Sequence, residues 1–107
     1  MICFVLEEIP VSKLKLSAEL AFSKGQSEES LKIWTQVISR EPKNEQHYYK
    51  RFRVQLRLQR FKDALKDLTS AIELKPAFEI AISQRAGLHL RLGHCREGMA
   101  DFQLLQQ

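Results

Sequence analysis

A period of 34 residues runs through this chain and constrains its fold more than any other feature. Its clearest copy is the segment 61–76, which reads FKDALKDLTSAIELKP. Apolar residues in this segment are spaced by three and four, which places them on one stripe of an α-helix. Shifting the segment by 34 residues toward either end again gives an apolar stripe, and Pro76 has its counterpart in Pro42. The chain is therefore predicted to repeat a helical unit at a fixed interval.

The stripe of this segment has six members: Phe61, Ala64, Leu65, Leu68, Ala71 and Ile72. We expect the charged residues between them to face water, namely Lys62, Asp63, Lys66, Asp67 and Glu73. Proline lacks an amide hydrogen and disfavours helix in the residue before it. The helix should therefore end close to residue 74.

Further residues recur with the same period. The recurring sets are Leu20, Val54 and Leu88; Phe22, Leu56 and Leu90; and Gly25, Gln59 and Gly93. With two helices in each period, the chain resembles the tetratricopeptide-repeat family, whose units are helix–turn–helix pairs. The resemblance implies an all-α, right-handed superhelical solenoid of three repeats. The chain departs from the family pattern at Phe52, where a small residue is usual, and at Gly98, where alanine is usual.

The predicted organisation is a lead-in at 1–10 followed by repeats at 11–44, 45–78 and 79–107, the last incomplete and without a capping helix. Helices are expected near 12–24, 28–40, 44–58, 61–74, 78–92 and 96–106. Ser27 is predicted to cap the second of them. Because glycine adopts left-handed backbone cheaply, the turn at Gln59 should be more strained than those at Gly25 and Gly93.

Repeats bury their apolar faces only against neighbouring units. We therefore expect either a piece of a longer array or self-association through the third repeat. Cys95 falls on the apolar stripe of that repeat and is predicted to be a buried thiol.

Composition and motifs narrow the function. The 107 residues are 44% hydrophobic with a formal net charge of +4, as expected for one folded domain. No apolar stretch is long enough for membrane insertion. The chain contains no phosphate loop or nucleophile elbow, and only His89, His94 and Cys95 distantly suggest a metal site. We therefore expect no enzyme activity, no cofactor and no metal.

In the resembled family, ligands bind a concave groove lined by the first helix of each repeat. The resemblance assigns nine residues of this chain to a groove for a protein partner: Lys15, Phe22, Tyr49, Arg53, Leu56, Arg57, Ile80, Leu90 and Arg91. Such a surface suits an extended or unfolded polypeptide, because apolar groups lose water while cations meet carboxylates or carbonyls. The alternative for the recurring set Phe22, Leu56 and Leu90 is simple packing between helices.

Other ligands remain as alternatives. One subclass of these repeats grips acidic chaperone tails with five polar residues, which would here be Lys15, Glu19, Lys50, Ile80 and Gln84. Only Lys15 matches, and Glu19 would repel an acidic tail. Six cations between residues 43 and 60 allow an RNA-binding helical repeat, but nucleic acid is disfavoured because they are spread around the helix. A scaffold for one specific folded partner is the remaining possibility.

Three runs of residues resemble one particular group within the tetratricopeptide-repeat family. The runs 48–51, 64–78 and 84–87 are similar to the N-terminal repeats of endoplasmic-reticulum J-domain co-chaperones that inhibit the interferon-induced protein kinase. This resemblance implies a module that holds unfolded clients for an Hsp70 in the lumen of the endoplasmic reticulum. Without it, a cytoplasmic location is expected, since the chain shows no signal peptide. Any stimulation of Hsp70 would have to come from outside these 107 residues, because they contain no J domain.

Overall fold

The computed structural model describes residues 9–106, which form six α-helices and no strand. The helices are α2 (Val11–Ser23), α3 (Ser27–Arg40), α4 (Glu45–Arg57), α5 (Phe61–Leu74), α6 (Glu79–Arg91) and α7 (Cys95–Leu105). Every predicted helix is present, and no boundary is displaced by more than one residue. The all-α helical-repeat prediction is confirmed.

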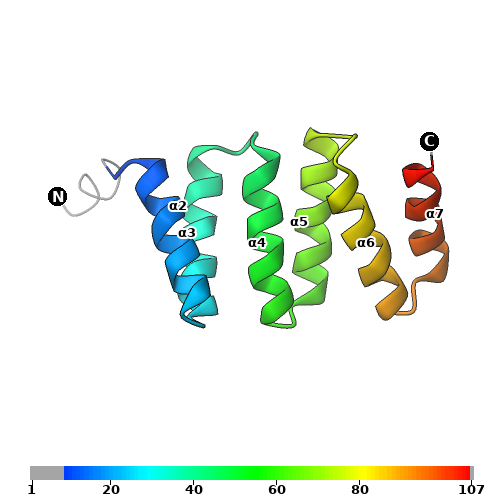
Figure 1. Ribbon diagram of the computed structural model, residues 1–107, viewed down its shortest axis with the longest axis horizontal. Helices are drawn as coiled ribbons and strands as arrows, with labels where there is room; N and C mark the ends of the chain where they lie inside the picture. The colour runs from blue at the N-terminus through cyan, green and yellow to red at the C-terminus, as the bar shows by residue number, and fades with distance from the viewer. Residues whose placement is uncertain (1–8, 107) are drawn as a thin grey trace.

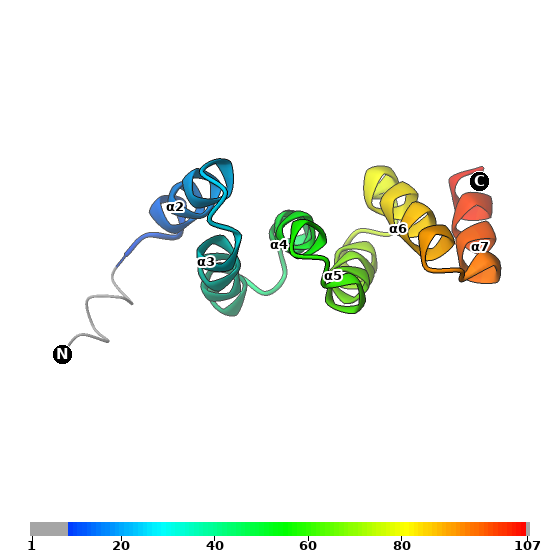
Figure 2. The same ribbon diagram turned by 90° about the horizontal axis from the view of Figure 1, so that it is seen from below.

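The helices are arranged as three antiparallel pairs in a row (Figure 1). The principal contacts join helices that follow one another in the chain, which makes the molecule elongated, with extents of 50 × 25 × 19 Å. Figure 2 shows α2, α4 and α6 along one side of the row and α3, α5 and α7 along the other. The first helices of the three pairs therefore share one face.

Two clusters of buried side chains hold the row together. The first joins the α2–α3 pair to α4 and centres on Trp34, which is 1% exposed. The second joins the α4–α5 pair to α6 and includes Phe52, which is 2% exposed. The Phe52 ring lies 5.4 Å from the ring of Tyr49, which in turn lies 5.5 Å from Phe78. The bulky residue that departs from the family pattern thus fills an aromatic core.

The three intra-pair turns have the predicted backbone. Gly25 and Gly93 have φ angles of 79° and 83°, and Gln59 has the corresponding left-handed φ of 60°. Among residues 9–106, Gln59 is the only non-glycine residue with positive φ. The left-handed backbone at this turn is the conformation in which the strain is expected, since a side chain there crowds the following carbonyl.

Two predictions at helix starts are wrong. Ser27 is the first residue of α3 rather than its cap, and the N-cap Gln26 makes no side-chain hydrogen bond. Ser27 is buried, because this position faces the following pair of helices. Cys95 occupies the same position in α7 but is exposed. The reason is that α7 is the last described helix, so no following pair covers it.

The prediction that Asp67 faces water is also wrong. Its side chain is 4% exposed and accepts two hydrogen bonds of 2.7 Å from Nε and Nη2 of Arg51. The same pair recurs 34 residues later, where Asp101 accepts bonds of 2.8 and 2.7 Å from Arg85. We call these the two Arg–Asp pairs. Each joins the two helices of one repeat in the bidentate geometry that arginine favours.

The two Arg–Asp pairs also reach the preceding repeat. Nη1 of Arg51 lies 3.4 Å from the Thr35 hydroxyl, and Nη1 of Arg85 lies 3.4 Å from that of Thr69. Each arginine therefore contacts two successive second helices. The first repeat has Ser17 and Ile33 at the equivalent positions, so it contains no such pair.

Candidate functional site

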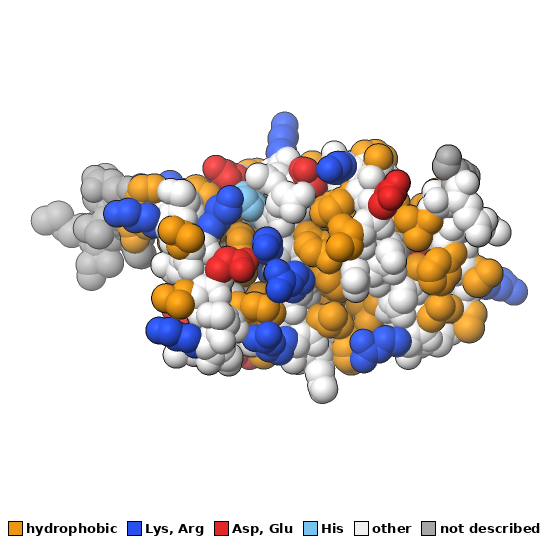
Figure 3. Space-filling model, in the orientation of Figure 1, with side chains coloured by type: hydrophobic (Ala, Val, Ile, Leu, Met, Phe, Trp, Pro, Cys, Tyr) orange, Lys and Arg blue, Asp and Glu red, His pale blue; other side chains and the backbone are white. Residues whose placement is uncertain are grey.

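The face formed by the first helices is hollowed by two adjoining cavities. Figure 3 shows hydrophobic side chains gathered over its middle, with Lys and Arg side chains among them. One cavity of about 440 Å³ is lined by Phe22, Tyr49, Phe52, Arg53, Leu56, Arg57 and Gln84. The other, of about 310 Å³, is lined by Phe52, Leu56, Gln84, Gly87, Leu88 and Arg91. The two cavities share Phe52, Leu56 and Gln84, and together we call them the α4 groove.

The middle of the α4 groove is apolar. Tyr49, Phe52 and Leu56 are spaced by three and four residues along α4, which places them on one side of the helix. Burial raises the pKa of the Tyr49 hydroxyl, against the opposing charge of Arg53. Tyr49 therefore remains neutral at physiological pH and acts as an aromatic wall with one polar end.

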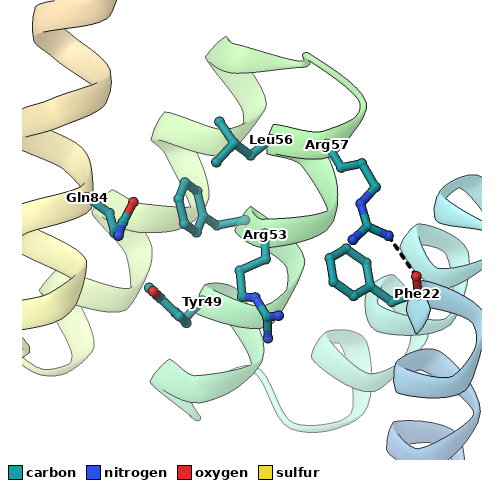
Figure 4. A pocket seen from close by; sticks show the side chains of 7 residues that line it. Phe22, Tyr49, Arg53, Leu56, Arg57 and Gln84 are labelled. Carbon is teal, nitrogen blue, oxygen red and sulfur yellow. Dashed lines mark hydrogen bonds between the residues drawn. The ribbon is translucent and has the colours of Figure 1, made fainter. Parts of the chain in front are cut away.

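The α2 side of the groove is built from an arginine–aromatic contact (Figure 4). Arg57 donates a hydrogen bond of 2.7 Å from Nη1 to the Phe22 carbonyl, and its Cζ lies 3.7 Å from the centroid of the Phe22 ring. Arg53 lies over the same ring at 5.1 Å. Since Phe22 is near the C-terminus of α2, the positive charge of Arg57 also interacts favourably with the negative end of that helix's dipole.

Cations in and around α4 differ in whether a carboxylate neutralises them. Outside the groove, ion pairs within 4.0 Å join Lys50 to Glu19, Arg51 to Asp67 and Arg60 to Glu28. The three arginines that line the groove, Arg53, Arg57 and Arg91, have no carboxylate partner within residues 9–106. The groove therefore carries three cations without a carboxylate partner, although other cations of the described residues, such as Lys15, Lys43 and Lys62, have no such partner either.

Most of the predicted groove residues line the cavities. Six of the nine do so: Phe22, Tyr49, Arg53, Leu56, Arg57 and Arg91. Lys15, Ile80 and Leu90 line neither cavity. Ile80 is 51% exposed, while atoms of the Leu90 side chain lie 2.9 Å from the position a Cβ of Gly98 would take. Leu90 therefore contacts α7, as the packing alternative expects, although its side chain is 40% exposed.

Phe22 and Leu56 combine both expected roles. Each is partly buried against one of the two core clusters and also lines the α4 groove. Four other lining residues are not among the nine, namely Phe52, Gln84, Gly87 and Leu88. The last three, with Arg91, are spaced by three and four along α6. Gln84 was named from the sequence only as a clamp position, and Gly87 already counted among the groove-facing positions of the repeat, so this spacing is the signal by which Leu88 could have been found.

Two of the five residues that would form a chaperone-tail clamp, Lys50 and Glu19, form an ion pair with each other. The Nζ atom of Lys50 lies 3.5 Å from Oε1 of Glu19. Ile80, a third clamp position, is apolar and cannot donate a hydrogen bond. At three of the five positions an acidic tail would therefore meet a lysine already paired with a glutamate, that glutamate, and an apolar side chain.

Two further properties bear on the site. Within the described residues, no group of three His, Cys, Asp or Glu side chains is placed to hold a metal ion. His89 and His94 contact each other, with their Nδ1 atoms 3.1 Å apart. No helix of residues 9–106 has the length and apolar character needed to cross a membrane.

No protein-family model matches the chain. It is 33% identical over 95 residues to the tetratricopeptide repeat and J domain-containing co-chaperone DNJ1 of Fusarium oxysporum, a match that covers 89% of this chain and 17% of that protein. The curated relatives it matches are much longer, and the chain spans between 15% and 17% of their length.

Solved structures show the same fold. The tetratricopeptide-repeat domain of P58(IPK) matches with a TM-score of 0.82 and 32% identity, over 90% of this chain and 27% of that chain. The second such domain of Spaghetti (RPAP3), bound to the HSP90 peptide SRMEEVD, matches with a TM-score of 0.80 and 25% identity, over 90% of this chain and 89% of that one.

Proposed function

Since the chain is a tetratricopeptide-repeat protein similar in sequence to J-domain co-chaperones, we propose that it binds extended segments of unfolded client proteins in the α4 groove. Its broader role is that of a protein-interaction module in the co-chaperone class. The endoplasmic reticulum as its location belongs to this proposal and follows from the resemblance alone.

The observation that carries the proposal is the combination of side chains in the groove. Its middle is formed by Phe52, Leu56 and Tyr49, so an apolar client side chain loses water on entering it. Around them stand arginines without carboxylate partners, whose guanidinium groups can donate to the carbonyls of an extended backbone. Neither contact requires one particular client sequence, which suits a protein that holds many unfolded chains.

The first experiment is suppression of the aggregation of a thermally unfolded model client, at about 50 and about 300 mM salt. Protection that persists at the higher salt is expected, because burial of apolar surface is not screened. Absence of protection at both salt concentrations would refute the proposal and favour a scaffold for one folded partner. Protection only at low salt would also refute it, since charge alone would then account for binding.

A pair of variants assigns the effect to the groove. Leu56 lines both cavities, so Leu56→Gln should raise the protein concentration needed for half-maximal protection about tenfold, as expected for about 1.5 kcal/mol of lost apolar burial. Leu16 is 71% exposed and lies outside the groove, so Leu16→Gln is the matched control and should protect like the original chain. Equal loss in both variants would exclude the groove as the binding surface.

A second candidate is binding of an acidic chaperone tail, because a structure similar to this one is bound to the HSP90 peptide SRMEEVD. The ion pair between Lys50 and Glu19 argues against it, since the glutamate would repel the tail. Titration of the labelled SRMEEVD peptide, followed by fluorescence anisotropy, should show no saturable binding. Micromolar binding that is lost in Lys50→Ala would instead establish this second function.

A further inference from the structure

A third cavity lies away from the α4 groove, where the turn before α5 meets the turn between α6 and α7. It has a volume of about 350 Å³ and is lined by Gln59, Phe61, Lys62, Leu65, Leu92 and His94. None of these residues lines the α4 groove. We call it the junction cavity, because it is formed where the second and third repeats meet.

The preceding junction, between the first and second repeats, shows what the same positions can do. The residues 34 positions earlier are Gly25, Ser27, Glu28, Leu31, Leu58 and Arg60. There the Glu28 carboxylate accepts a hydrogen bond of 2.6 Å from Nη2 of Arg60, so an ion pair joins the two repeats. A carboxylate at this place is therefore compatible with the geometry of the junction.

The junction cavity has no carboxylate at the position equivalent to Glu28. Lys62 replaces Glu28 and His94 replaces Arg60, so two nitrogen groups stand where an acid and a base meet in the preceding repeat. Within residues 9–106 Lys62 has no carboxylate within 4.0 Å, and the Nδ1 atom of His94 lies 3.1 Å from that of another imidazole, His89.

The apolar lining of the junction cavity is larger than that of the preceding junction. Phe61 replaces the small, buried Ser27, while the leucines are kept as Leu65 and Leu92. All three side chains are partly buried and pack against the second core cluster. The junction cavity thus offers an apolar wall beside positive charge that has no partner in the described part of the chain.

We infer that the junction cavity binds a peptide segment in which an apolar side chain is followed by a carboxylate. The apolar side chain enters between Phe61, Leu65 and Leu92, where it loses contact with water. The carboxylate lies between Lys62 and His94, the positions equivalent to Glu28 and Arg60 of the preceding junction. Gln59 adds an amide that can both donate to and accept from the peptide backbone.

The test is a titration of the isotope-labelled protein with the peptide Gly-Ser-Leu-Asp-Ser-Gly, blocked at both ends, followed by amide chemical shifts. Saturable shifts are expected at Phe61, Lys62 and Leu92, and none at the groove residue Arg53. The same peptide with Asn in place of Asp should bind about two- to fivefold more weakly, as for one exposed ion pair. Equal binding of both peptides, shifts only in the α4 groove, or no shifts would overturn the inference.

Substitutions at Lys62 decide whether the cavity itself is responsible. Lys62→Glu places an acid opposite His94, as in the preceding junction, and should abolish saturable binding. Lys62→Met removes the charge alone and should weaken binding about two- to fivefold. Lys66→Glu changes the same charge one turn further along α5, outside the cavity, and is expected to leave binding unchanged. Full binding by Lys62→Glu, with an unchanged thermal midpoint, would overturn the inference.

Discussion

Replacing Arg51 by serine tests how the Arg–Asp pairs stabilise the stack. The substitution removes two charge-assisted hydrogen bonds of 2.7 Å and leaves the Asp67 carboxylate, 4% exposed, without a cation. Breaking a buried pair in this way typically costs 3–5 kcal/mol. The Arg51 side chain is 21% exposed, so water can partly reach the vacated place, and we expect a loss of about 3 kcal/mol.

The first repeat supplies the matched control for this change. Its equivalent positions are Ser17 and Ile33. The double variant Arg51→Ser with Asp67→Ile therefore gives the second repeat the same two residues that the first repeat has. Because the buried charge is then removed together with its partner, the double variant should lose about 1 kcal/mol or less. The double variant should accordingly be about 2 kcal/mol more stable than Arg51→Ser alone.

Urea denaturation followed by circular dichroism measures both free energies of unfolding. The pH dependence gives an independent check. Burial raises the pKa of Asp67, and the hydrogen bonds from Arg51 oppose that rise. Without Arg51 the pKa rises further, so folded Arg51→Ser holds this proton more tightly than its unfolded chain does. The contribution of this carboxyl to the stability of the variant is therefore fully present below the unfolded pKa and is lost as pH rises through the folded pKa.

The cost of Arg51→Ser should consequently be larger near pH 7 than near about pH 5. A single variant that loses less than about 1 kcal/mol would refute the reasoning, because the carboxylate would then tolerate isolation. A double variant as unstable as the single one would refute it as well, since loss of packing rather than of charge compensation would explain the effect.

Three further substitutions test the fold. Gln59→Gly should raise the free energy of unfolding in urea by about 0.5–1 kcal/mol, because it relieves a left-handed residue; a decrease would contradict the strain assigned to this turn. Gly98→Ala should lower the thermal midpoint despite its higher helix propensity, because the new Cβ would lie 2.9 Å from Leu90; a higher midpoint would show that Leu90 moves aside without cost. Trp34→Ala should cost about 3–5 kcal/mol in urea, since the side chain is 1% exposed, and a loss below about 1 kcal/mol would place it outside the core.

The helices and turns could be read directly from the sequence. The segment 61–74 was predicted with both of its boundaries, because apolar periodicity and the proline at 76 act on the local backbone. The left-handed turn at Gln59 followed from its alignment with Gly25 and Gly93 at the 34-residue period. Such features depend on residues close in sequence, or on a repeat that shows the same position three times.

The candidate site was only partly predictable, and the residues that were missed explain why. Tyr49, Arg53 and Leu56 were identified by their position in the repeat, whereas Phe52 and Leu88, which were not assigned to the groove, also line it. Ile80 was assigned to the groove by the same position rule, yet it lies outside both cavities. Which side chains line a cavity depends on the local packing of two helices, which a repeat register does not contain.

What the sequence alone determined is therefore the all-α repeat, its helix boundaries and its turns, because these follow from local backbone preferences and periodic apolar burial. What only the tertiary structure decided is which charged residues are buried and which form ion pairs. A helical pattern places Asp67 on the polar side of α5, but Arg51 on a neighbouring helix pairs with it and makes its burial tolerable. Lys62 has no ion-pair partner among residues 9–106, because the side chain that lines the same cavity, His94, is not a carboxylate. Partners across space set the free energy of each charge, and sequence spacing does not reveal them.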